Sequence, residues 1–154
     1  MNRLTAFIIF CVFSILQSSA QTNDNADRAF QQADESGRYV LLVFSGSDWC
    51  APCIRLEKKI FSTTLFQDFA TSELIMLVAD FPQRKRMAKE LQQQNEALAE
   101  RYNPNGLFPY VLLLRSDRSV VSEVPYNNET VQTFIATLRQ YINHDKSLRV
   151  QKTN

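Results

Sequence analysis

Hydrophobic positions along this chain alternate between helical spacing and short unbroken runs, which predicts alternating helices and strands. Between residues 26 and 33 the apolar positions recur with helical spacing, and Gly37 stands where such a helix would stop. Residues 39–44 form an unbroken apolar run, which is typical of a strand buried on both faces. The same reasoning predicts further strands at residues 74–79, 110–114 and 120–124. It also predicts helices at residues 52–69, 87–102 and 129–143.

The order of these elements is typical of one α/β domain. Strands alternate with helices along most of the chain, which indicates a central sheet with helices on both faces. The last two strands are joined by a short turn at residues 116–118, so we expect them to be antiparallel neighbours in a mixed four-stranded sheet. A chain of 154 residues is long enough for one hydrophobic core. We place the domain at residues 26–145 and a C-terminal tail at residues 146–154.

The first twenty residues have the layout of a secretory signal peptide. The weakly cationic start at Arg3 is followed by an apolar run at residues 4–16 and by small residues that end at Ala20. An uncleaved membrane anchor is the alternative, but the run is shorter than the roughly 20 residues that a spanning helix needs. We expect cleavage after Ala20, a flexible N-terminus at residues 21–25 and no stable membrane insertion of the mature chain. The predicted location is the periplasm, with general secretion as the alternative.

The balance of charges argues against one broad class of partner. The chain has 17 Lys and Arg against 16 Asp and Glu, a formal net charge of +1. A protein that binds nucleic acid through phosphate contacts needs a clear excess of positive charge. The composition therefore predicts no nucleic-acid partner.

Two cysteines, Cys50 and Cys53, carry the predicted chemistry. They follow a buried strand and begin a helix that has Pro52 in its first turn. The N–H groups and the positive dipole end of a helix stabilise a thiolate and lower its pKa. We expect Cys50, at the exposed edge of the turn, to attack a substrate disulfide and Cys53 to resolve the mixed disulfide. A disulfide that closes so short a loop adds little stability, so reactivity explains the pair better than a structural staple.

Zinc binding is the main alternative for a Cys-x-x-Cys pair. A structural zinc site takes four ligands, and after signal cleavage the chain offers only two cysteines and His144. His144 also lies at the far end of the last predicted helix. No metal site is therefore predicted.

Residues 26–143 resemble the thioredoxin-like family. The resemblance is carried by the strand at residues 40–44, by the run from Ser45 to Cys53 that contains Trp49-Cys50-Ala51-Pro52-Cys53, and by Phe108-Pro109. It implies a cis-proline at Pro109 opposite the active-site disulfide. It also implies that substrates bind against Trp49, Ala51 and Pro52 and, through backbone contacts, against Phe108 and Pro109.

The Ala-Pro pair between the cysteines is similar to that of exported bacterial disulfide reductases. The resemblance therefore implies a protein-disulfide reductase that needs no cofactor beyond the redox-active Cys50–Cys53 disulfide. Its expected partners are protein thiols and disulfides, and a membrane-embedded thiol–disulfide carrier that reduces it again. A disulfide oxidase or isomerase uses the same chemistry at another potential and stays an alternative, as does a non-catalytic binding module of the same fold.

One position departs from the family pattern. Thioredoxins carry a buried aspartate six residues before the first cysteine, and this chain has Phe44 there. The proton acceptor usually assigned to the resolving cysteine is therefore missing. Asp48 is a candidate substitute, and Glu57 or water are alternatives that the sequence leaves open.

Overall fold

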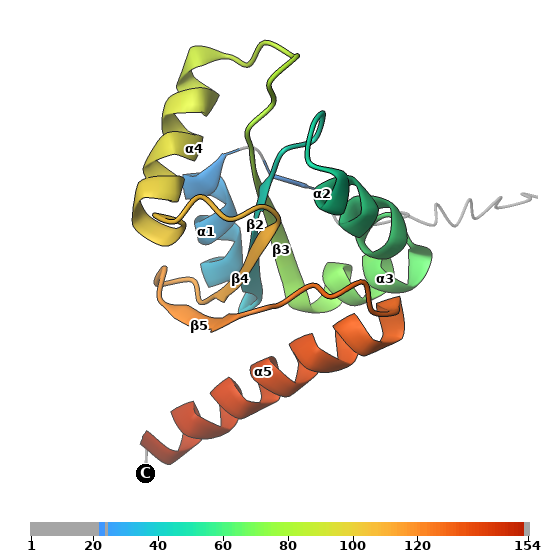
Figure 1. The fold of residues 1–154 in the computed structure, drawn as a ribbon. Helices are drawn as coiled ribbons and strands as arrows, with labels where there is room; N and C mark the ends of the chain where they lie inside the picture. Colours follow the sequence, from blue (N-terminus) through green and yellow to red (C-terminus); the bar gives the residue numbers. More distant parts are fainter. Residues whose placement is uncertain (1–21, 24, 153–154) are drawn as a thin grey trace, which may run out of the picture.

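The computed structural model describes residues 22–23 and 25–152, which fold into one mixed sheet with helices on both faces (Figure 1). The sheet has the strand order β1-β3-β2-β4-β5. Its strands are β1 (Thr22–Asn23), β2 (Tyr39–Ser45), β3 (Leu74–Asp80), β4 (Tyr110–Leu114) and β5 (Val120–Glu123). The helices are α1 (Ala26–Ser36), α2 (Ala51–Leu56), the π-helix η1 (Glu57–Phe61), α3 (Thr64–Glu73), α4 (Lys89–Tyr102) and α5 (Val131–Lys152).

The centre of the sheet confirms the predicted fold class. β2 pairs in parallel with β3 along its whole length, from Tyr39 opposite Leu74 to Ser45 opposite Asp80. On its other side β2 pairs antiparallel with β4, which in turn pairs antiparallel with β5. The four predicted strands therefore form the expected mixed sheet. Its parallel half brings the ends of β2 and β3 to the same edge, where the cysteines begin.

The N-terminus adds a strand that the sequence does not predict. Within the expected flexible segment, Thr22 and Asn23 pair in parallel with Met76 and Leu77 of β3. The outer side of β3 would otherwise present unpaired N–H and C=O groups, which a neighbouring segment satisfies by pairing. Asn25 then caps α1, because its Oδ1 accepts a hydrogen bond from the Arg28 N–H at 2.8 Å.

Two hydrophobic cores lie on the two faces of the sheet, because neighbouring residues of β2 point to opposite sides. Leu41 and Val43 belong to the core under α2, η1, α3 and α5. Val40, Leu42 and Phe44 belong to the core under α1 and α4. Figure 1 shows α1 and α4 on one side of the sheet and α2, α3 and α5 on the other. Both faces of the sheet are thus covered by helices and buried in a core.

The last helix is longer than predicted. α5 ends at Lys152 instead of residue 143, so the expected tail is helical as far as Lys152. Asp145, which is only 2% exposed, explains the extension. Its carboxylate accepts hydrogen bonds from the Tyr39 hydroxyl, at 2.8 Å, and from the Arg115 guanidinium. These partners fix the helix two residues beyond its predicted end.

Two further boundaries differ from the prediction. The helix that begins after Cys50 changes to a π-helix at Glu57, and α4 begins at Lys89 instead of Met87. The predicted signal peptide lies outside the described residues. Within residues 22–23 and 25–152, no helix has the length and apolar character needed to cross a membrane.

Candidate active site

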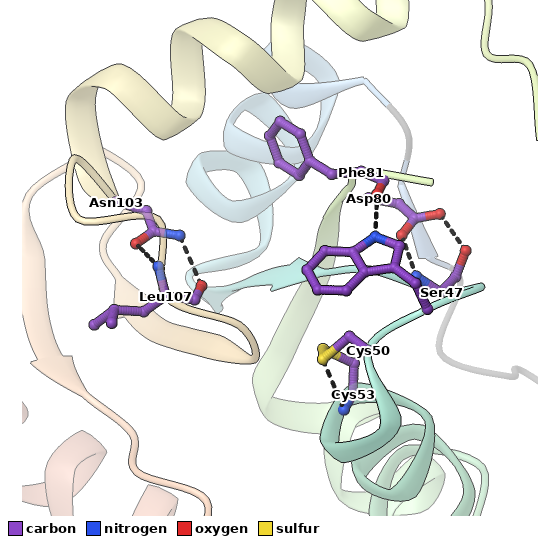
Figure 2. The surroundings of a disulfide bond; sticks show 8 residues. Ser47, Cys50, Cys53, Asp80, Phe81, Asn103 and Leu107 are labelled. Carbon is purple, nitrogen blue, oxygen red and sulfur yellow. Dashed lines mark hydrogen bonds between the residues drawn. A yellow bond between two sulfur atoms is a disulfide. The ribbon is translucent and has the colours of Figure 1, made fainter. Parts of the chain in front are cut away.

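Cys50 and Cys53 form a disulfide at the start of α2 (Figure 2). Cys50 is the N-cap of this helix, with an extended backbone, and its Sγ accepts the Cys53 N–H at 3.2 Å. The Cα atoms of the two cysteines are 5.2 Å apart. The helix therefore directs a backbone N–H at the sulfur that would carry negative charge after reduction.

The expectation of an exposed Cys50 is wrong for the disulfide form. Cys50 is 4% exposed and Cys53 is 3% exposed. As an N-cap, Cys50 turns its side chain back over the first helical turn, so its sulfur lies against the helix instead of extending into solvent.

Pro109 lies close to the cysteines, and the Phe108–Pro109 peptide bond is cis, as the resemblance implies. Pro109 and Cys53 line the same small cavity of about 20 Å³. The turn before this bond is closed by buried Asn103, whose Nδ2 donates to the Leu107 carbonyl and whose Oδ1 accepts the Leu107 N–H, both at 2.9 Å (Figure 2). Asn103 is a functional-site residue that the sequence pattern did not indicate.

An aromatic surface adjoins the cysteines. Trp49 is 38% exposed, and its ring meets the Phe108 ring edge-on at a centroid distance of 5.4 Å. The Phe81 ring packs against Phe108 at 5.6 Å, and the Phe81 carbonyl accepts the Trp49 Nε1–H at 2.7 Å. Ala51 and Pro52 are also exposed. The residues predicted to bind substrate therefore include exposed apolar surface next to the disulfide.

Gly46 makes room for the Trp49 ring. A Cβ at Gly46 would lie 2.6 Å from the indole Nε1, far inside van der Waals contact. Only glycine therefore allows the indole to lie this close to the turn and still reach the Phe81 carbonyl.

The loop between β2 and the cysteines is fastened to residues 80–85, which we call the clasp. Ser47 donates to the Asp80 carboxylate through its N–H at 2.8 Å and its hydroxyl at 2.5 Å (Figure 2). The Asp48 carboxylate accepts three backbone N–H groups, from Gln83, Arg84 and Lys85, at 2.9, 2.7 and 3.2 Å. Asp80 was not among the site residues predicted from the sequence. Its position at the end of a strand parallel to β2 was the available signal.

The hydrogen bonds that Asp48 accepts from the clasp change the pKa of its carboxyl group. The N–H of Gln83, with those of Arg84 and Lys85, lowers the pKa of Asp48 below its usual value. This effect outweighs the opposing effect of desolvation. Asp48 therefore holds the loop as a carboxylate, and its oxygens are directed at the loop amides.

Glu57 lines two cavities that Cys53 also lines, one of about 610 Å³ and one of about 20 Å³. It lies four residues after Cys53, on the first turn of η1, and lines the 20 Å³ cavity with Cys53 and Pro109. Its Oε1 accepts the Ser62 hydroxyl at 2.9 Å. Phe44, at the position of the missing aspartate, is fully buried in the core on the α1 and α4 side.

The remaining candidate ligand, His144, lies on α5 and is exposed. Within residues 22–23 and 25–152, no group of three or more His, Cys, Asp or Glu side chains is arranged to hold a metal ion.

Comparison with known proteins supports the same reading. A family model described as thioredoxin-like matches residues 21–116. The disulfide bond reductase DsbH of Chlamydia pneumoniae is 32% identical over 89 residues, which is 58% of this chain and 53% of that protein. The thioredoxin-related protein DsbJ of the same organism is 26% identical over 121 residues, 79% of this chain and 35% of that protein. The chain thus spans about half of the length of DsbH and about a third of the length of DsbJ.

Solved structures share the fold. A structure named DsbH oxidoreductase has a TM-score of 0.76 at 22% identity and covers 82% of this chain and 86% of its own. A thioredoxin from Thermus thermophilus has a TM-score of 0.57 at 17% identity, with 80% of this chain and 87% of its own covered. At such identities the likeness concerns the fold alone.

Proposed function

Because this chain belongs to the thioredoxin-like family, we propose that it is a protein thiol–disulfide oxidoreductase that works through Cys50 and Cys53. One observation carries the proposal: the two cysteines form a disulfide at a helix N-terminus, with cis-Pro109 lining a cavity beside Cys53. The direction we propose is reduction of protein disulfides. It is supported by the name of the similar DsbH protein and by the Ala-Pro pair, which places no histidine between the cysteines.

In the proposed reaction the reduced protein supplies two electrons. The Cys50 thiolate attacks one sulfur of a substrate disulfide, forming a mixed disulfide and releasing the other substrate sulfur as a thiolate. The Cys53 thiolate then attacks Cys50 Sγ, which breaks the mixed disulfide and releases the second substrate thiol. The Cys53 N–H favours the first step, because it already points at Cys50 Sγ.

We assign removal of the Cys53 proton to Glu57 instead of Asp48. Glu57 lines two cavities that Cys53 also lines, and its Oε1 accepts a hydrogen bond from the Ser62 hydroxyl. Asp48 lines neither of them, and its carboxylate is engaged by three amides of the clasp. A water molecule in the cavity is the competing acceptor.

The substrate is proposed to lie against the aromatic surface. Trp49, Ala51 and Pro52 would supply apolar contact, while Phe108 and Pro109 would offer backbone groups to an extended segment. The oxidised product is proposed to be reduced again by a membrane-embedded thiol–disulfide carrier. The periplasm is the proposed location, which the layout of residues 1–20 supports.

The first experiment is equilibration of the mature protein with glutathione or dithiothreitol buffers. A reduction potential near that of thioredoxin, about −270 mV, supports the reductase. A value towards about −120 mV assigns it as an oxidase instead. Insulin reduction with dithiothreitol should be lost in Cys50→Ser and kept in the exposed-site control Gln93→Leu. Unchanged turnover in Cys50→Ser would contradict the proposed reaction. If Cys50 and Cys53 form no disulfide in any of the buffers, the binding-module alternative takes its place.

A further inference from the structure

A groove of about 610 Å³ lies beside the disulfide, on the side of Cys53. It is bounded by the ends of β2 and β3, by the helix that carries the cysteines, and by α4 together with Met87, two residues before it. Figure 1 shows α2 and α4 at the same end of the sheet. The proposed exchange reaction uses Cys53 and Glu57 at one side of this groove and assigns no role to the opposite side.

Asn95, on that opposite side, is buried with an unused acceptor. It is 1% exposed, and its Nδ2 donates to the Asp80 carbonyl at 2.9 Å and lies 3.7 Å from the Met87 sulfur. A carbonyl only accepts hydrogen bonds, so this contact fixes which amide atom is nitrogen. Asn95 Oδ1 then has no donor among the described residues. A buried acceptor without a donor is costly. Because Asn95 lines this groove, as well as a second cavity beside Phe81, an N–H or O–H group bound in the groove would satisfy it.

The rest of the lining defines the ligand further. The lining holds two carboxylates, Asp80 and Glu57, and one cation, Lys58, so its formal charge is negative. Its walls are apolar: Ile54, Val78, Met87 and Leu91. The complementary group has an apolar stem and a cationic end with several N–H donors, which describes a lysine or arginine side chain.

We propose that this groove binds an arginine or lysine side chain of the client protein, close in sequence to the cysteine that reacts with Cys50. This inference rests on the proposed function. Cys53 lines the groove, and its Cα is 5.2 Å from that of Cys50. A client joined to Cys50 can span that distance within about two residues, since an extended chain advances roughly 3.5 Å per residue. The groove would thus select clients by a basic residue.

Binding is tested without any redox step, on the disulfide form of the mature protein. The probes are N-acetyl-arginine amide, N-acetyl-norleucine amide and N-acetyl-glutamate amide, each titrated while the Asn95 side-chain amide and the Met87 methyl are followed by NMR. The arginine probe should shift both signals, the norleucine probe should shift only the methyl, and the glutamate probe should shift neither. Equal shifts with all three probes, or none with arginine, would overturn the proposal.

Selectivity is tested with short peptides whose single cysteine is joined to thionitrobenzoate and flanked by arginine, norleucine or glutamate. The reduced protein should release the thionitrobenzoate from the arginine peptide roughly tenfold faster than from the norleucine peptide, measured as kcat/KM. Asn95→Leu should remove this preference, and Gln93→Leu, an exposed change on the same helix, should keep it. Equal rates for the three peptides in the unsubstituted protein would overturn the assignment to a client side chain.

The NMR titration and the thionitrobenzoate assay test this inference separately from the proposed function on which it rests. If no peptide releases its thionitrobenzoate, the proposed oxidoreductase function fails. The NMR titration still decides the groove, because it uses the unsubstituted disulfide form and needs no turnover.

Discussion

The Asp48 carboxylate accepts the Arg84 backbone N–H at 2.7 Å, although the two residues are 36 positions apart. This hydrogen bond joins the turn that carries the cysteines to the loop that follows β3. With the neighbouring bonds from Gln83 and Lys85, and the bonds from Ser47 to Asp80, it makes the active-site turn part of a two-loop unit. The geometry of the cysteines therefore depends on residues far from them in sequence.

Acidification should break the hydrogen bonds between Asp48 and the clasp. Because the folded-state pKa of Asp48 is lowered, its stabilising effect is fully present above the unfolded value of about 3.9 and is lost as the pH falls through the folded value. Hydrogen-exchange protection factors of the Gln83, Arg84 and Lys85 amides should fall over that range. In Asp48→Asn they should be lower at neutral pH and insensitive to acid. Protection that is equal in both proteins at neutral pH would contradict this role.

Gly46→Ala should displace Trp49. The added Cβ would meet the indole, so the ring must leave the Phe81 carbonyl and the Phe108 ring. The chain contains one tryptophan, so its fluorescence reports the displacement directly. Insulin reduction should fall as well. Gly37→Ala is the control: Gly37 has φ +68° and open space around it, so this change should cost about 1 kcal/mol of stability and leave the fluorescence unchanged.

Glu57→Gln should slow the resolving step. If Glu57 takes the proton of Cys53, the variant should form the mixed disulfide at a normal rate and resolve it about tenfold or more slowly. Acid quenching followed by mass spectrometry would then detect the accumulated mixed disulfide, and the pH profile of resolution should change. Glu100→Gln, an exposed change on α4, should behave as the unsubstituted protein. Normal resolution in Glu57→Gln would assign the proton transfer to water.

Asp145→Ala should destabilise the fold without changing the chemistry. Burial, together with the hydrogen bond to Asp145, raises the pKa of Tyr39 to about 12, and the substitution leaves Tyr39 and Arg115 without this partner. The Arg115 side chain is 30% exposed and can hydrate, so we expect a loss of about 2 kcal/mol in denaturant unfolding. Lys146→Ala breaks an exposed pair with Glu73 and should cost under about 1 kcal/mol. Similar losses in both variants would show that burial of Asp145 is unimportant.

The elements that could be predicted are those set by the pattern of apolar residues close together in the sequence. The apolar run at β2 and the helical spacing of α1 are properties of neighbouring residues, so both elements were found within a residue of their bounds. The Cys50–Cys53 pairing was also predictable, because the two residues are three positions apart at a helix start. Family resemblance added the cis bond at Pro109, which local pattern does not indicate.

The remaining features depend on contacts between distant segments. The bonds of Asp48 to Arg84 and of Asp145 to Tyr39 join residues 36 and 106 positions apart, and hydrophobic periodicity carries no signal for either. The same holds for the unused acceptor of Asn95, which on α4 looks like any polar helix residue. The burial of Cys50 follows from cap geometry, which sequence spacing alone does not give.

The π-helix η1 changes the direction in which side chains point between α2, which carries the cysteines, and α3, which packs in the core. In a regular α-helix two adjacent residues point about 100° apart, yet Ile60 and Phe61 are 0% and 4% exposed and belong to the same core. The wider turn accommodates one residue more than an α-helical turn would. Residues before Glu57 can therefore keep the orientation that the cysteines require, while those after it keep the orientation that the core requires. Homologous chains that differ by a single-residue insertion or deletion here could keep the same disulfide and the same α3.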